Sequence, residues 1–294
     1  MATTGEYAGS EQDATTLVGA LLVRTRPADL LALVAVPLVL LGVFALPEAT
    51  RRSLAFQYTD PTVLTAYTAH FVHLEANHLI ANLFGYCLLA GTGYAVALLS
   101  RRRRFFFTAM ATYLLAFPFV LSALNLAVPR HAIGYGFSGI NMAFLGVLPL
   151  VMAAYARVHL YPESSVQPLP AVFFASVAWM ALLALPVGLE GAAAVGGGVV
   201  AFGALVGVWY LHSAMRARGW RRAVREWTAA VTARPGYGDL FVVGIVLLIA
   251  YPVVGFPTNP VGEGRVLNLY VHLLGYCLGF IGPYALLAAG IFRD

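Results

Sequence analysis

Residues 135–146 of this 294-residue chain read Tyr-Gly-Phe-Ser-Gly-Ile-Asn-Met-Ala-Phe-Leu-Gly, and they stand where a polar turn gives way to a long apolar run. Ser138 carries the one hydroxyl of this stretch that is suited to act as a nucleophile, and it falls near the predicted start of a helix. Two other groups of polar residues lie in apolar surroundings, at 73–82 and at 272–279. We expect the fold to bring both groups to Ser138.

The composition is that of a membrane protein. Hydrophobic residues make up 60% of the chain, charged residues make up 11%, and the mean hydropathy is +0.79. In an average soluble domain about a quarter of the residues are charged. The regular alternation of apolar and polar residues that marks membrane barrels is absent. The chain is therefore predicted to be an all-α, polytopic membrane bundle.

Eight apolar segments are predicted to cross the bilayer, because about 20 apolar residues span a hydrocarbon core about 30 Å thick. A short surface helix is expected at 14–24, and Asp29 is expected to cap the first span. The arginine-rich segment 214–236 has apolar residues on one helical face and is predicted to lie on the membrane surface. The eight predicted spans are 30–46, 69–99, 105–126, 138–156, 168–187, 192–213, 239–254 and 267–291.

The chain divides into a polar N-terminal tail, residues 1–28, and one transmembrane domain, residues 29–294. Its first 23 residues lack the positive charge that opens a signal peptide, so we expect no cleaved leader and a disordered tail. Cys87 and Cys277 both fall in apolar segments, where a thiol behaves as a small hydrophobe. A pairing of these two cysteines stays open.

The placement of the arginines predicts the orientation, because cytoplasmic loops are enriched in basic residues. All 18 basic residues are arginine. With the N-terminus inside, 14 of them face the cytoplasm and four, at 51, 52, 130 and 265, face outward. Ser138, His272 and His78 then all lie toward the outer face, at a shared depth.

The three polar groups together contain what amide hydrolysis requires. A serine hydroxyl becomes a nucleophile when a base takes its proton, and the neutral imidazole of His272 suits that role near neutral pH. His78 and Asn82 stand on one helical face and can donate hydrogen bonds to an oxyanion. Taken alone, each residue has an ordinary structural explanation as a hydrogen-bonding group within or between helices. The conjunction of all three groups favours catalysis.

These residues resemble the motifs of the rhomboid family of intramembrane serine proteases, in the family's order along the chain. The resemblance covers predicted spans two to four and the last span. The motifs are His73-x4-His78-x3-Asn82, then Gly136-x-Ser138-Gly139 with Gly146 seven residues later, then His272-x2-Gly275-x3-Gly279.

The resemblance implies that Ser138 is the nucleophile, His272 the general base, and His78 and Asn82 the oxyanion donors. It implies substrates that are single-span membrane proteins cut within the lipid bilayer, with no metal or other cofactor and no nucleic acid as partner. We expect a multi-pass protein of a prokaryotic plasma membrane with both termini in the cytoplasm. The glycines expected to let the last helix press against the Ser138 helix are Gly139, Gly146, Gly275 and Gly279.

Three features depart from the family pattern. The family's common core has six helices with the histidine on the sixth, whereas His272 is on the eighth predicted span. An inserted pair leaves the last helix entering from the same side. Met142 stands where relatives often have an aromatic that stacks on the histidine, and its sulfur can pack there. The first connector lacks the family's Trp-Arg dipeptide.

Other interpretations explain less of the sequence. The glycine pattern at 134–139 matches a dinucleotide-binding fingerprint, but no strand is predicted before it. Residues 73–78 read H-x-E-x-x-H rather than the adjacent H-E of a zinc peptidase, so a metalloenzyme is a lesser alternative. His70, His73 and Asn77 share one face and either support the active-site loop or face water. A rhomboid-like protein that binds transmembrane clients without cutting them, and a transporter, also stay open.

Overall fold

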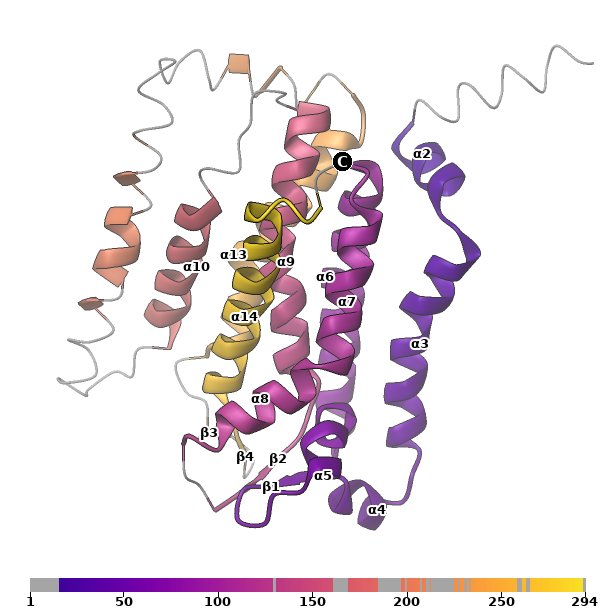
Figure 1. Cartoon of the computed structure of the whole chain (residues 1–294), viewed down its shortest axis with the longest axis vertical. Helices are drawn as coiled ribbons and strands as arrows, with labels where there is room; N and C mark the ends of the chain where they lie inside the picture. The colour runs from indigo at the N-terminus through magenta and orange to yellow at the C-terminus, as the bar shows by residue number, and fades with distance from the viewer. Residues whose placement is uncertain are drawn as a thin grey trace, which may run out of the picture.

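The computed structural model describes residues 16–128, 131–160, 169–184, 234–257, 261–262 and 265–292, with short pieces between 197 and 232. These residues are mostly helical, and the long helices run side by side as a bundle (Figure 1). Two short antiparallel strand pairs lie in the connections between helices. The predicted all-α helical bundle is confirmed at this level.

The elements fall into long apolar helices, shorter helices and strand pairs. The long helices are α3 (Pro27–Phe44), α6 (Ala76–Leu99), α9 (Ser138–Tyr155), α13 (Tyr237–Gly255) and α14 (Leu269–Ala288). The shorter ones are α2 (Leu17–Arg24), α4 (Glu48–Ser53), α5 (Val63–Thr68), η1 (Ala69–Phe71), α7 (Arg103–Leu115), α8 (Phe117–Asn125), the π-helical η2 (Ala156–Leu160) and α10 (Leu169–Leu183). The strands pair as β1 (Phe56–Gln57) with β2 (Ile133–Gly134) and β3 (Val261–Gly262) with β4 (Arg265–Val266).

Five of the described helices are long and apolar enough to cross a membrane, or six if the bent pair α7–α8 counts as one span. These six units correspond to six of the eight predicted spans. In the segment predicted at 168–187, α10 has 15 residues, fewer than a full crossing needs. The predicted span at 192–213 and the predicted surface segment at 214–236 lie mostly outside the described residues. The count of eight spans stays a prediction.

Two helix starts differ from the prediction. The second predicted span begins at 69, but α6 begins at Ala76, because residues 63–71 form α5 and η1 and a non-helical turn follows them. The first long helix begins at Pro27, so Asp29 is its third residue rather than its cap. The Asp29 carboxylate still accepts a hydrogen bond from the backbone N–H of Arg26, at 3.2 Å, and so closes the helix start.

The α7–α8 pair bends by 48°. Pro118 is the second residue of α8, and its ring nitrogen has no hydrogen to donate to the preceding turn. The missing hydrogen bond explains why one predicted span, 105–126, is two helices. The bend turns α8 beneath the start of α9 (Figure 1), where Leu121 lies within reach of Gly139.

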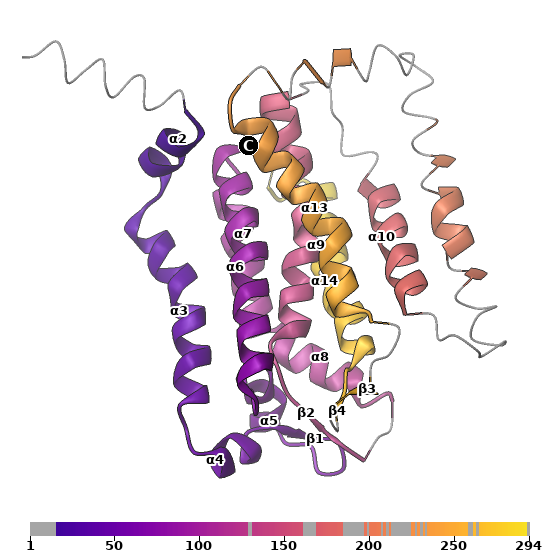
Figure 2. The same ribbon diagram turned by 180° about the vertical axis from the view of Figure 1, so that it is seen from behind.

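The centre of the bundle is α9. In the candidate span that it forms with η2, 83% of the window is buried within the protein, against 17% for α3. A helix that is apolar on all sides is stable when neighbours surround it. The neighbours of α9 are α6 and α14, with α13 across its back and α10 at the periphery (Figure 2).

Close contact between α9 and α14 depends on small residues. A Cβ on Gly275 would collide with the backbone carbonyl of Gly139, and a Cβ on Gly279 would collide with the backbone of Ala143. A Cβ on Gly146 would meet the α14 backbone in the same way. In lipid, where no hydrophobic force drives helices together, such close backbone approach supplies the packing energy. The glycine contact predicted from the motifs is therefore present.

The connections that precede Ser138 are tied together at one end of the bundle. Strand β1 from the first connector pairs with β2, with Phe56 opposite Gly134. The N–H of Gly136 donates to the carbonyl of Ala69 at 3.0 Å. Figure 2 shows α4, α5, β1 and β2 gathered at this end, opposite to α2. The turn before α9 is thereby held by residues that are about 65 to 80 positions earlier in the chain.

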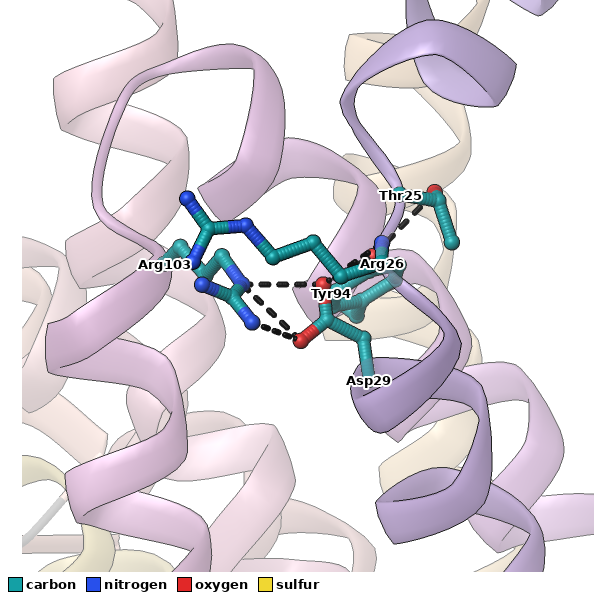
Figure 3. Close-up of polar contacts among 5 residues, drawn as sticks. All are labelled: Thr25, Arg26, Asp29, Tyr94 and Arg103. Atoms are coloured by element: carbon teal, nitrogen blue, oxygen red, sulfur yellow. Dashed lines mark hydrogen bonds and ion pairs between the residues drawn. The ribbon is translucent and has the colours of Figure 1, made fainter.

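A buried ion pair joins α3 to the bundle at the other end. Asp29 is 2% exposed, and its carboxylate accepts hydrogen bonds from the guanidinium of Arg103, including Nε to Oδ2 at 2.8 Å. The hydroxyl of Tyr94 donates to the same carboxylate at 2.9 Å (Figure 3). A buried charge is stable only when it is paired and hydrogen-bonded, as here. One carboxylate thus connects α3, α6 and α7.

Two glycines of α14 make a matched test of the α9–α14 contact. Gly279 faces the Ala143 backbone, whereas a Cβ on Gly282 would have no neighbour within 4 Å. We expect Gly279→Ala to destabilise the protein by about 1–3 kcal/mol through overpacking, and to lower the thermal unfolding midpoint in detergent. Gly282→Ala should leave it unchanged or raise it slightly, because alanine favours helices. Equal midpoints for the two variants would contradict the proposed packing.

Candidate active site

Ser138 is the first residue of α9, and its position depends on the turn that precedes it. Gly136 has a φ of +113°, a conformation that residues with side chains rarely adopt. This turn reverses the chain from β2 into the helix, and Phe137 behind it is fully buried. The N-terminal end of a helix also carries exposed N–H groups and a partial positive charge, which favour a developing anion.

The imidazole of His272 meets the hydroxyl of Ser138. Nε2 of His272 lies 2.7 Å from Oγ of Ser138, although the two residues are 134 positions apart in the chain. His272 is 3% exposed, whereas Ser138 is half-buried. The structure therefore brings together the two residues that the sequence predicts as nucleophile and base.

The second ring nitrogen of His272 identifies the tautomer. Nδ1 lies 2.7 Å from the carbonyl oxygen of Gly255, the last residue of α13. A carbonyl can only accept, so Nδ1 must carry the hydrogen and Nε2 is left to accept a hydrogen bond from the Ser138 hydroxyl. The sequence does not predict this role for Gly255, because it arises where α13 ends beside α14.

Met142 and Phe256 surround the imidazole. Met142, one turn after Ser138, is 1% exposed, and its terminal methyl group fills the space that a Cβ on Gly255 would need. The ring of Phe256 stands edge-on to the His272 ring, with centroids 6.0 Å apart. Met142 therefore lies beside Gly255, the residue that bonds to the histidine, and Phe256, which directly follows α13, provides the aromatic contact with the ring. Packing of the methionine sulfur on the histidine stays a prediction.

Asn268 anchors the start of α14, one turn before His272. Its Oδ1 accepts from the N–H of Val271 at 3.2 Å, which is a helix cap. Its Nδ2 donates to Oδ1 of Asn125 at 3.0 Å and to the hydroxyl of Tyr58 at 3.2 Å. The cap is visible in the sequence as an asparagine before an apolar run, but its links to α8 and to the first connector are not.

The two predicted oxyanion donors flank Ser138. The ring of His78 lies against Gly136, two residues before the serine, so that a Cβ there would meet the ring at 2.6 Å. Asn82 is 4% exposed and contacts Asn141, three residues after the serine. His78 therefore lies against the turn that precedes α9, and Asn82 lies against the first turn of α9.

Asn141 sets the orientation of the Asn82 amide. The Nδ2 of Asn141 donates to the Asn82 side-chain oxygen at 3.2 Å and to its backbone carbonyl at 2.9 Å. Because the Asn82 oxygen accepts from Asn141, the Asn82 nitrogen is assigned on the other side, where it donates to the carbonyl of His78 at 3.0 Å. An NH2 group has a second hydrogen, which can serve a ligand. Asn141 was missed in the sequence, although it stands three residues after Ser138.

His73 supports the turn at Gly136 and Phe137 that precedes α9. It is fully buried, and its Nε2 accepts from the backbone N–H of Phe137 at 3.4 Å. The guanidinium of Arg51 donates to the backbone carbonyl of His73 at 2.6 Å. Of the two roles left open for this histidine, support of the loop is the one that the structure has. Burial, together with the nearby His78, lowers the pKa of His73 to about 3.

His70 has a similar role in the first connector. Its Nε2 lies 3.1 Å from the hydroxyl of Ser122 on α8, and that hydroxyl donates to the carbonyl of Ala66 at 2.8 Å. Burial lowers the pKa of His70 to about 4. Both histidines are therefore neutral in the folded protein at pH 7.

The H-x-E-x-x-H pattern does not assemble a ligand cluster. Among the described residues, no three side chains of the histidine, cysteine, aspartate and glutamate types converge as metal ligands would. His73 and His78 contact each other edge to face, with ring centroids 5.0 Å apart. Their positions follow from the support of the turn and from contact with Gly136.

The buried histidines predict a pH dependence of stability. The unfolded chain takes up a proton at each histidine near pH 6.5, whereas folded His70 and His73 stay neutral to about pH 4 and pH 3. Below pH 6.5 the unfolded state binds more protons than the folded state. The contribution of the two neutral histidines to the free energy of unfolding is therefore fully present above pH 6.5 and is lost as the pH falls. We expect a lower thermal unfolding midpoint at pH 5.0 than at pH 7.5.

The variant His70→Gln should reduce this pH difference, because it removes one of the titrating groups. His131→Gln, which replaces an exposed histidine, is the matched control and should retain the full difference. The explanation fails if the midpoint does not change between the two pH values, or if His70→Gln behaves like the control.

Comparison of this chain with protein-family models, with curated proteins and with solved structures finds no match. The geometry of the Ser138 and His272 side chains and the spacing of the sequence motifs are therefore the grounds on which a function is assigned.

Proposed function

We propose that this protein is an intramembrane serine endopeptidase of the rhomboid type. The observation that carries the proposal is the 2.7 Å separation between Oγ of Ser138 and Nε2 of His272, with the other ring nitrogen bonded to a carbonyl. A serine hydroxyl and a neutral imidazole in this arrangement form a nucleophile and its general base. The proposed substrate is a peptide bond in a single-span membrane protein.

The proposed reaction starts with attack of Oγ of Ser138 on the carbonyl carbon of the substrate. His272 takes the hydroxyl proton at Nε2 as the new C–O bond forms. The imidazolium then gives this proton to the departing amine as the C–N bond breaks, which leaves an acyl-enzyme. A water molecule, deprotonated by His272, hydrolyses the acyl-enzyme and restores Ser138.

In the proposed mechanism the Gly255 carbonyl does the work that a carboxylate does in a three-residue triad. It accepts from Nδ1 and so keeps Nε2 free to receive the serine proton. When His272 becomes positively charged, the carbonyl dipole stabilises the imidazolium at Nδ1. Gly255 therefore acts through its backbone as a positioning residue.

The proposed oxyanion site uses donors on both sides of Ser138. The side chain of His78 lies against Gly136, before the serine, and the amide of Asn82 lies against Asn141, after it. The backbone N–H of Ser138 itself is the third proposed donor. Donors fixed before the reaction stabilise charge that develops in the transition state without reorganising. Asn141 contributes by holding the Asn82 amide in its orientation.

The arrangement of helices supports the same proposal. Six units, α3, α6, the α7–α8 pair, α9, α13 and α14, would form the six-helix core, with the serine on the fourth and the histidine on the sixth. The chain between η2 and α13, including α10, would be an insertion into this core. On the arginine distribution, we propose that Ser138 lies toward the outer face of a plasma membrane and that both termini are cytoplasmic.

The direct test is cleavage of a single-span substrate by the purified protein in lipid vesicles. Ser138→Ala and His272→Ala should each reduce the rate by about a thousandfold or more, because the nucleophile and its base act as one unit. Ser53→Ala, which changes an exposed serine, should retain full activity. Cleavage by both dyad variants at the rate of the unaltered protein would refute the proposal.

The same assay separates the enzyme from a protein that only binds transmembrane clients. A client-binding protein would retain the substrate peptide without producing fragments, and neither dyad substitution would change that binding. The proposed enzyme produces fragments, and Ser138→Ala abolishes them while still binding the uncut substrate.

The oxyanion role of Asn82 has its own test. Asn82→Ala should lower kcat by about a hundredfold to a thousandfold with little change in KM, because the lost hydrogen bond forms in the transition state. Asn77→Ala, on the same helix but exposed, is the control and should have normal kinetics. Asn141→Ala should lower kcat by a smaller factor. An Asn82→Ala effect confined to KM would exclude the oxyanion role.

A further inference from the structure

A cavity lies at the end of the bundle opposite to Ser138. Its volume is about 450 Å³, and it opens between the start of α3 and the turn that joins α6 to α7. Four of its six lining residues are arginines. The lining residues are Val23, Arg24, Arg26, Leu98, Arg101 and Arg103.

The cavity carries an excess of positive charge. Asp29 forms an ion pair with Arg103 and offsets its charge. Arg24, Arg26 and Arg101 are exposed, and none of them forms an ion pair among the described residues. Figure 3 shows the guanidinium groups of Arg26 and Arg103 on the same side of the Asp29 carboxylate. Three positive charges therefore face a space large enough for a small anion.

The backbone around the cavity has an unusual feature. Arg101 has a φ of +61° and is the one residue other than glycine with a positive φ in the described part of the chain. Such a conformation costs energy for an arginine, and the hydrogen bond from the N–H of Arg102 to the carbonyl of Ala97, at 2.7 Å, holds it in the turn. This turn ends α6 at Leu99 and leaves Arg101 in the lining of the cavity.

Two helix starts add to the positive potential. Both α3 and α7 begin beside the cavity, at Pro27 and at Arg103. Helix N-termini carry a partial positive charge and favour anions, phosphates above all. Arginine guanidinium groups match phosphate oxygens through paired hydrogen bonds.

The helices beside the cavity, α2 and α3, carry exposed apolar side chains, one of which, Val23, lines the cavity. Leu22, Val23 and Leu31 are each more than 70% exposed, on the helices that flank the cavity. In a membrane such side chains contact acyl chains, and the arginines next to them stand at the level of the headgroups. A soluble anion would use only the charged part of this site, whereas a phospholipid would use both parts.

We infer that this cavity binds the phosphate group of an anionic phospholipid, with the arginines around the phosphate and the acyl chains along α2 and α3. The bound headgroup bridges α2 and α3 to the α6–α7 turn. Because α3 is mostly exposed to lipid and is joined to the bundle at this level by Asp29, the lipid reinforces its docking. This inference does not depend on the proposed protease activity.

The test measures lipid binding to the full-length protein in a non-ionic detergent by native mass spectrometry. The probes are phosphatidylglycerol, phosphatidylcholine and inorganic phosphate. The unaltered protein should retain phosphatidylglycerol and should bind phosphatidylcholine at least about tenfold more weakly, because only the first has a net negative headgroup. Competition by inorganic phosphate at millimolar concentration would identify the phosphate as the group recognised, and its failure to compete would assign recognition to the whole lipid.

The variant Arg26→Gln with Arg101→Gln should weaken phosphatidylglycerol binding about thirtyfold, because two charges near the headgroup are lost. The matched control, Arg104→Gln with Arg157→Gln, removes two exposed arginines that do not line the cavity. It should change binding less than twofold. Equal weakening in the two double variants would mean general attraction to a basic surface, and it would overturn the site.

Hydrogen exchange on the unaltered protein gives a second measurement that does not depend on the folding of a variant. Phosphatidylglycerol should slow exchange at the backbone amides of residues 22–31 and 98–104, and phosphatidylcholine should not. Protection elsewhere with none in these two segments would also overturn the site.

Discussion

The contact between α9 and α14 is the constraint on which the rest of the structure depends. Gly275 and Gly279 approach the α9 backbone so closely that any side chain at either position would collide with it. This approach brings the first turn of α14 to the first turn of α9, where Nε2 of His272 and Oγ of Ser138 are 2.7 Å apart. The hydroxyl of Tyr113 donates to the carbonyl of Gly279 at 2.7 Å and holds the same contact from α7.

The tautomer of His272 is fixed by a backbone carbonyl and not by a carboxylate side chain. A charged side chain within a membrane protein is costly unless it is paired. The carbonyl of Gly255 orients the His272 ring through Nδ1 and introduces no net charge. Where the protein does bury a carboxylate, at Asp29, it provides the guanidinium of Arg103 and the hydroxyl of Tyr94 as partners. At one end of the bundle a neutral carbonyl orients the buried histidine, and at the other end a buried carboxylate is paired with a guanidinium.

Much of the site could be predicted from the sequence, because its polar residues interrupt apolar runs. The motifs predict that Ser138, His272, His78 and Asn82 lie together, and the structure gathers them around the start of α9. The role of Gly255 could not be predicted, because every residue has a backbone carbonyl. Only the packing of α13 in the bundle determines which carbonyl reaches His272.

Hydropathy alone predicts the apolar segments of the fold but not the exact start, end and bend of each helix. Hydropathy locates an apolar segment but does not register where the segment bends, so the 105–126 span became α7 and α8, broken before Pro118. It also cannot place a helix start that tertiary contacts decide, as at Ala76. Asp29 was expected as a simple cap, and its ion pair with Arg103, 74 positions away, depends on how α3 docks.

The central claim is that His272 activates Ser138 as a nucleophile, and covalent labelling tests it most directly. A fluorophosphonate reacts with a serine only when a base has made its hydroxyl nucleophilic. Reaction with the purified protein followed by peptide mass spectrometry should place one adduct on Ser138, and His272→Ala should slow its formation by about a thousandfold or more. An unlabelled Ser138, or labelling of Ser138 at the same rate without His272, would contradict the account.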